Sequence, residues 1–146
     1  MDLRSYSVKG PREDALTYIA EQLTEAGYVK EDYKQSLLER EKIFPTGIYL
    51  PDSVNVAIPH TETCFVNEDL FVIGVPEEPI IFNQIDDPEK ELAVDIIFLF
   101  AIKNPQKYLS VLASLTENFS NEELLGYLKH RDMENIEKFL KTNVLN

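Results

Sequence analysis

Apolar residues recur at helical spacing in the first part of the chain. Residues 1–10 show no clear period, and we expect a strand or an extended arm there. Pro11 predicts the start of a helix, because proline fits the first turn and the acids after it face the positive end of the helix dipole. The apolar stripe of this helix is formed by Ala15, Leu16, Ile19, Ala20 and Leu23. Gly27 predicts its end.

A second helix is predicted over residues 31–41. Its inner face is formed by Tyr33, Leu37 and Leu38. Arg40 comes near the end of this helix, and Phe44-Pro45-Thr46-Gly47 then breaks it and turns the chain, because proline cannot continue a helix.

The middle of the chain contains short runs of β-forming residues. We predict strands at residues 47–50, 54–58, 70–75, 79–82 and 93–102. The last run is almost continuously apolar and β-branched, which is typical of a central strand covered on both faces. Some connections between these strands are short and others long, so we expect a mixed sheet.

Helical spacing returns in the last third of the chain. One helix is predicted over residues 106–119, a second after the capping-box-like Ser120-Asn121-Glu122-Glu123, and a third from Asp132. Helices on both sides of a block of strands predict an α/β fold, an αβα three-layer sandwich with a mixed central β-sheet flanked by helices. We expect residues 1–146 to form one domain.

Composition narrows the class of protein. The chain is 44% hydrophobic and 27% charged, as in an ordinary soluble globular protein. Its net charge of −12 argues against nucleic acid and anionic membranes as partners. The same charge suits a partner with a basic docking face, or simply maintains solubility. The longest apolar run, residues 96–102, is too short to cross a bilayer.

The N-terminus and the single cysteine indicate a compartment. The first residues lack the basic and apolar regions of a signal peptide. Cys64 has no partner for an internal disulfide, which agrees with a reducing cytoplasm. No cationic cluster surrounds Cys64 in the sequence, so we expect a buried or merely tolerated thiol rather than a reactive one.

One of only two histidines stands directly after an apolar run that stops at a proline. The run is Asn55-Val56-Ala57-Ile58-Pro59, and the histidine is His60. A histidine at a strand end is more often structural than catalytic. His60 is nevertheless a candidate phosphate-carrying nucleophile, because an unprotonated imidazole can attack at cellular pH. Thr61 and Glu62 supply polar groups beside it, and Arg40 is a candidate charge partner.

Other kinds of site have less support. The two histidines, His60 and His130, are distant in sequence and no CxxC or HExxH occurs, so we expect no metal site. Neither GxxxxGK[ST] nor GxGxxG is present, which leaves nucleotide binding without support. A Ser-His-Asp or Cys-His arrangement stays open, although GxSxG is missing. His130, between Lys129 and Arg131, is interpreted as a surface residue at a helix C-terminus.

The order of these features resembles a known family. Leu38-Glu39-Arg40-Glu41, Phe44-Pro45-Thr46-Gly47-Ile48 and Val56-Ala57-Ile58-Pro59-His60 together resemble the "RE…PTG(I)…AIPH" pattern of enzyme IIA of the sugar phosphotransferase system, in its fructose–mannitol superfamily. The resemblance covers nearly the whole chain and identifies residues 1–146 as a type-2 enzyme IIA domain. The segments around Phe82-Asn83-Gln84 and Asn104-Pro105-Gln106 are most similar to the galactitol-type branch.

The resemblance implies a phosphoryl relay without a cofactor or metal. His60 would accept a phosphoryl group from the phosphorylated carrier protein HPr and pass it to enzyme IIB. Membrane-bound enzyme IIC would then deliver it to a galactitol-like or fructose-like sugar or sugar alcohol. Arg40 would compensate the phosphate charge. Many members have a second histidine near the active one, and Tyr108 takes that place here.

The sequence leaves three alternatives open. Thr61 and Glu62 are expected either to orient the imidazole or to line the docking surface. Phe44 and Phe65 are expected to contribute to an apolar rim around His60, or to lie in the core. The alternative function is that of a regulatory module that controls a partner protein through its phosphorylation state, because enzyme IIA-like domains also occur in regulators.

Overall fold

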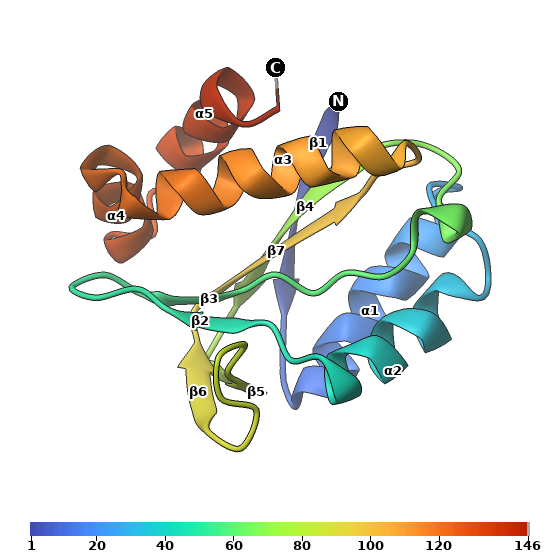
Figure 1. Cartoon of the computed structure of the whole chain (residues 1–146), viewed down its shortest axis with the longest axis horizontal. Helices are drawn as coiled ribbons and strands as arrows, with labels where there is room; N and C mark the ends of the chain where they lie inside the picture. Colours follow the sequence, from blue (N-terminus) through green and yellow to red (C-terminus); the bar gives the residue numbers. More distant parts are fainter. Residues whose placement is uncertain (146) are drawn as a thin grey trace.

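A five-stranded mixed sheet forms the centre of the molecule in the computed structural model, which describes residues 1–145 (Figure 1). Its strands, in spatial order, are β1 (Asp2–Val8), β4 (Leu70–Pro76), β7 (Ile96–Ala101), β3 (Asn55–Ala57) and β2 (Gly47–Tyr49). Strand β1 is parallel to β4 and β3 is parallel to β7, whereas the β4–β7 and β2–β3 pairs are antiparallel. The predicted mixed sheet is therefore confirmed, and the N-terminal segment is a strand.

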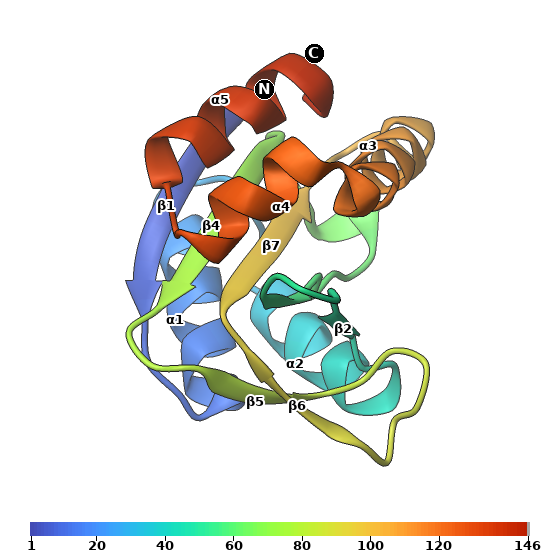
Figure 2. The ribbon, with the colours of Figure 1, turned by 90° about the vertical axis from the view of Figure 1, so that its left-hand side faces the viewer.

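Helices cover both faces of this sheet (Figures 1 and 2). One face is covered by α1 (Arg12–Glu25) and α2 (Tyr33–Ile43). The other is covered by α3 (Pro105–Glu117), α4 (Glu122–Lys129) and α5 (Met133–Asn143). Short 3-10 turns occupy Thr63–Phe65 and Asn118–Ser120. This arrangement confirms the predicted αβα sandwich.

The central strand β7 separates two hydrophobic cores. All six of its residues are buried, as expected for a strand covered on both faces. Because side chains alternate along a strand, Ile97 and Leu99 belong to the core beneath α1 and α2, whereas Phe98 and Phe100 belong to the core beneath α3, α4 and α5. A strand buried in this way holds the segments beside it in fixed positions, including β3, which leads to His60.

The prediction of a single strand over residues 93–102 is wrong. The run is divided at Asp95 into β6 (Glu91–Val94) and β7, which belong to different sheets. Strand β6 pairs with β5 (Ile80–Asn83) in a two-stranded sheet beside the main one. Asp95 makes the break because it bonds to Asn55 in both directions: its carboxylate accepts the Asn55 N–H at 3.0 Å, and its own N–H donates to the Asn55 carbonyl at 2.8 Å.

Several helix ends agree with the sequence signals, although α2 begins and ends two residues later than predicted and Asn121, not Ser120, is the N-cap of α4. Gly27 adopts a φ of 85° after α1, a left-handed conformation that favours glycine. The side chains of Asn104, Asn121 and Asp132 accept backbone N–H groups at the starts of α3, α4 and α5. None of the helices within residues 1–145 has both the length and the apolar character needed to cross a bilayer.

Replacing Gly47 by alanine is expected to lower the free energy of unfolding by about 1–3 kcal/mol. A Cβ atom at Gly47 would lie 2.7 Å from the Asn83 carbonyl oxygen, which is backbone and cannot move aside cheaply. The two segments are held together there because the Ile85 N–H donates to the Gly47 carbonyl at 2.9 Å. Urea denaturation measures the change.

Gly126→Ala is the matched control. Gly126 lies inside α4, and a Cβ atom added there meets nothing within 4 Å. Alanine is the better helix former, so this variant is expected to gain about 0.5–1 kcal/mol. Losses of similar size in both variants would contradict the close-approach explanation for Gly47.

Candidate functional site

His60 lies just beyond the end of β3. The strand ends at Ala57, and Ile58 and Pro59 lead out of the sheet. The Nδ1 atom of His60 lies 2.9 Å from the Ile58 carbonyl oxygen. A carbonyl can only accept, so in the neutral imidazole Nδ1 is the protonated nitrogen and Nε2 carries the free lone pair. The fold thus selects the nitrogen that can act as a nucleophile.

Aromatic residues support the imidazole from the side of α3. The Tyr108 ring centroid lies 5.8 Å from that of His60, at a tilt of 55°. Tyr108 in turn packs against Phe100 of β7, with centroids 4.9 Å apart. Burial raises the pKa of the Tyr108 hydroxyl, so it stays neutral at physiological pH. The tyrosine at this position therefore contributes packing and a neutral hydroxyl but no charge.

Arg40 projects toward the same place from the last turn of α2. Its guanidinium carbon lies 5.1 Å from the centroid of the Phe44 ring, a cation–π distance. Burial lowers the pKa of His60 below its usual 6.5, and the positive charge of Arg40 lowers it further, although the hydrogen bond to Ile58 opposes both. The histidine is therefore neutral at pH 7. Within residues 1–145, the buried Arg40 Nε has no hydrogen-bond partner.

An open groove of about 570 Å³ brings the predicted site residues together. Its lining includes Arg40, His60, Thr61, Glu62 and Tyr108, which are the five site residues predicted from the sequence. Exposed apolar side chains lie at or beside this groove. Leu109 is 62% exposed and lines it, and Phe44 and Ile43, which are 59% and 67% exposed, line a smaller hollow on the other side of Arg40.

The remaining candidates from the sequence differ in their burial. Thr61 is buried, and its hydroxyl contacts that of Ser36, whereas Glu62 is exposed. Both line the groove, while the Ile58 carbonyl holds the His60 ring. Phe65 packs against the core beneath α1 and α2, so of the two phenylalanines only Phe44 is exposed.

Cys64 and His130 both lie at the surface. Cys64 is exposed and lines the groove, so of the two expected alternatives, a buried thiol or a merely tolerated one, the buried thiol is wrong. Its Sγ lies 3.7 Å from a Glu62 carboxylate oxygen. His130 is exposed and caps the C-terminus of α4, which confirms the surface interpretation. Residues 1–145 contain no cluster of three or more metal-ligating side chains.

One buried carboxyl beside the site was not predicted from the sequence. Glu41 is 3% exposed, and its two oxygens accept the backbone N–H of Thr46 at 2.8 Å and the Thr46 hydroxyl at 2.7 Å. Burial raises the pKa of Glu41 to about 7, while the bonds to Thr46 and the charge of Arg12 act in the opposite direction. Its spacing of four residues from Leu37, and eight from Tyr33, places an acid on the apolar stripe of α2. That spacing was one available signal, and the Arg40-Glu41 pair in the sequence pattern quoted above was another.

Comparisons with known proteins show the family of the chain. Residues 7–143 match the family described as "Phosphoenolpyruvate-dependent sugar phosphotransferase system, EIIA 2". The galactitol-specific EIIA component of Escherichia coli K12 is 30% identical over 117 residues, covering 80% of this chain and 77% of that protein.

Two solved structures share the fold. The crystal structure of IIA mannitol from Escherichia coli aligns with a TM-score of 0.62 at 27% identity, over 87% of this chain and 86% of the other. The complex of enzyme IIAMTL and phosphorylated enzyme IIBMTL from Escherichia coli gives a TM-score of 0.65 at 24% identity, over 87% of this chain and 85% of that chain.

NMR titration of His60 is expected to give a midpoint below 6.5. The direction follows from burial, which disfavours the charged imidazolium, and from the nearby Arg40 charge. Arg40→Gln removes that charge, so its His60 midpoint should rise toward the ordinary value. An unchanged midpoint in Arg40→Gln would contradict the electrostatic contact between the two residues.

The stability of Glu41→Gln relative to the unaltered chain is expected to depend on pH. The folded pKa of about 7 exceeds the ordinary 4.5, so the stabilising contribution of protonated Glu41 is complete below pH 4.5 and is lost as pH rises to 7. Glutamine does not titrate. The variant should therefore gain up to about 3 kcal/mol on the unaltered chain between pH 4.5 and 7. Urea denaturation at both pH values measures this gain, and a constant difference would disprove the raised pKa.

Proposed function

We propose that this chain, which belongs to the EIIA 2 family of the phosphoenolpyruvate-dependent sugar phosphotransferase system, carries a phosphoryl group on Nε2 of His60. The observation that carries the proposal is the hydrogen bond from Nδ1 to the Ile58 carbonyl. That bond leaves Nε2 as the unprotonated nitrogen, in a groove that also contains a guanidinium.

The reaction is an in-line displacement between two nitrogen atoms. The Nε2 lone pair attacks phosphorus on the phosphorylated histidine of the carrier protein HPr, and the donor's N–P bond breaks with its electron pair returning to the donor ring. The His60 ring acquires positive charge as the new N–P bond forms. Nδ1 keeps its proton, and the Ile58 carbonyl dipole stabilises that charge.

Arg40 acts on the phosphoryl oxygens. A phosphorylated side chain carries roughly −1.5 to −2 charge at neutral pH, and a guanidinium can donate two parallel hydrogen bonds to such a group. The Arg40 Nε gives this role structural support, because it is a donor without an acceptor among residues 1–145. Tyr108 supports the imidazole through ring packing.

The partners are proteins, and the groove suits them better than a small molecule. Its openness to solvent and the exposed Phe44, Ile43 and Leu109 favour docking of an apolar surface. The net charge of −12 favours partners with basic docking faces. HPr is the proposed donor, and the cysteine of a cognate enzyme IIB is the proposed acceptor, as family membership suggests.

The final acceptor is a sugar or sugar alcohol that enters through membrane enzyme IIC. The galactitol-specific relative makes a galactitol-like substrate the first choice, and a mannitol- or fructose-like one the next.

We place the relay in the cytoplasm, where the free, exposed Cys64 stays reduced. Transfer onward to enzyme IIB separates this transport role from a purely regulatory one, which needs the phosphorylated state but no enzyme IIB.

Incubation with phosphoenolpyruvate, enzyme I and HPr is expected to label His60. Phosphopeptide mapping locates the label, and His60→Ala should abolish it. Arg40→Gln should slow labelling by about 100- to 1,000-fold, as expected when one charge-stabilising donor is lost. His130→Ala is the matched control and should label normally, because His130 is exposed at the end of α4. Equal labelling of His60→Ala and the unaltered chain would disprove the mechanism.

A further inference from the structure

We propose that Glu41 is a positioning residue that holds both His60 and Arg40 in the geometry needed for phosphoryl transfer. The inference rests on the proposed function and assigns a role to a buried side chain that the transfer chemistry does not use. It stands on a series of hydrogen bonds that runs from Glu41 to the His60 ring.

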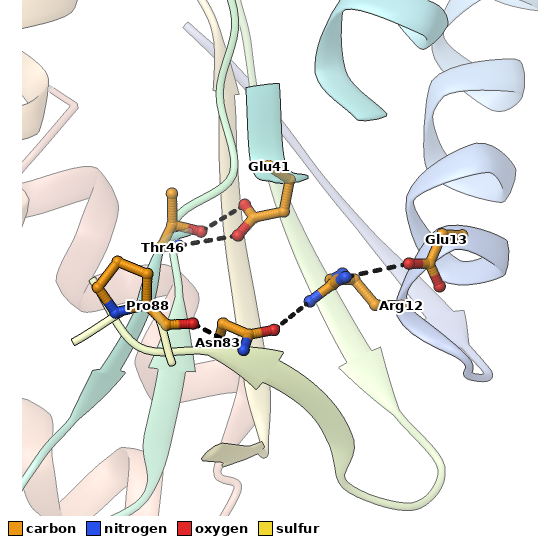
Figure 3. A network of polar contacts seen from close by, with 6 residues as sticks. All are labelled: Arg12, Glu13, Glu41, Thr46, Asn83 and Pro88. Carbon is orange, nitrogen blue, oxygen red and sulfur yellow. Dashed lines mark hydrogen bonds and ion pairs between the residues drawn. The ribbon is translucent and has the colours of Figure 1, made fainter. Parts of the chain in front are cut away.

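The series begins at the Glu41 carboxylate. Figure 3 shows both of its oxygens directed at Thr46, one to the backbone and one to the side chain. Glu41 and Thr46 are 3% and 2% exposed, so water does not compete for these bonds. Glu41 therefore fixes the Thr46 peptide relative to α2, across a turn that contains Pro45.

The series continues into the segment that carries His60. The Thr46 carbonyl accepts the N–H of Ile58 at 3.3 Å, and the Ile58 carbonyl in turn faces Nδ1 of His60 at 2.9 Å. The backbones of two residues, Thr46 and Ile58, thus link the Glu41 carboxylate to the imidazole. A displacement of Thr46 would move Ile58, and with it the acceptor that selects the His60 tautomer.

Arg40 is positioned by the same carboxyl in a different way. It precedes Glu41 in the last turn of α2, and its carbonyl accepts the N–H of Phe44 at 2.7 Å. The turn from Phe44 to Thr46 is thus closed at both ends, by this backbone bond and by the Glu41 bonds. Phe44 also stacks on the Arg40 guanidinium, so the turn sets the direction of that side chain.

Arg12, which belongs to a second network of hydrogen bonds, acts on Glu41 through its charge. Arg12 of α1 donates to the Asn83 side chain at 2.9 Å and to Glu13 at 3.0 Å, and Asn83 donates to the Pro88 carbonyl at 2.9 Å (Figure 3). The positive charge of Arg12 favours the ionised Glu41. The carboxyl therefore has the Thr46 peptide as its hydrogen-bond partner and the Arg12 cation as a nearby charge.

Substitutions can separate positioning from bulk stability. In Glu41→Gln, the amide oxygen can accept the Thr46 N–H while the amide N–H group donates to the Thr46 hydroxyl, so both links survive. Glu41→Ala removes both and leaves a buried N–H without a partner. Thr46→Val removes only the hydroxyl link at nearly constant shape, and Thr46→Ser restores it. Glu25→Ala removes a carboxylate from the exposed end of α1 and is the control.

The experiment measures the His60 ring and the transfer rate in the same variants. The ¹⁵N shifts of the ring report which nitrogen carries the proton, without any phosphoryl donor. At pH 8, the unaltered chain, Glu25→Ala and Glu41→Gln are expected to show His60 protonated at Nδ1. Glu41→Ala is expected to show a mixture of the two tautomers and to accept phosphate from phospho-HPr about 10- to 100-fold more slowly, as a small misplacement of reacting groups predicts.

The outcomes separate this inference from the proposed function. If Glu41→Ala folds and matches Glu25→Ala in tautomer and rate, the inference is overturned. If Glu41→Ala does not fold, the Thr46 pair decides: a tautomer mixture in Thr46→Val but not in Thr46→Ser supports the inference, and identical spectra overturn it. If phospho-HPr does not label the unaltered chain, the proposed function fails while the tautomer comparison still tests the link from Glu41 to His60.

Discussion

The hydrogen bond between Nδ1 of His60 and the Ile58 carbonyl constrains everything else at the site. It exists because β3 stops at Ala57, so the carbonyl that follows is free of the sheet ladder and can accept from a side chain two residues later. Pro59 makes this stop certain, because it has no N–H to continue the ladder. The same bond decides which ring nitrogen carries the free lone pair, and in the proposed relay that nitrogen would be the nucleophile.

Burial and charge act on that histidine in the same direction. The imidazole is half-buried in the groove that Tyr108 and Arg40 also line. Its burial and the positive charge of Arg40 both lower its pKa. A neutral ring is needed for attack, whereas a cation beside it is needed once phosphate arrives. In the proposed relay, one guanidinium would meet both requirements, because the charge that disfavours a proton on His60 would favour a phosphoryl group there.

The sequence predicted the layers of the fold and five of the side chains that line the groove, but not the contacts between them. Periodicity and turn residues are local signals, so they located the helices, the central strand and His60. The break at Asp95 was missed because it depends on Asn55, forty residues away, which no local pattern can reveal. Glu41 was missed for a related reason: its carboxyl is tolerated in the core only because Thr46 offers two donors across the turn.

Tyr108 shows how a change of one residue type alters what the site must do. A second imidazole beside His60 would bring its own proton and a variable charge, whereas a buried phenol stays neutral. Without phosphate, the charge that acts on His60 is that of Arg40, and exposed Glu62 lies at the groove edge. Phosphorylation would then reverse the local charge from positive toward negative in one step. In the proposed relay, the donor and the acceptor would share one docking surface but meet opposite charges on it. The donor would therefore bind the unphosphorylated state more tightly, and the acceptor the phosphorylated state.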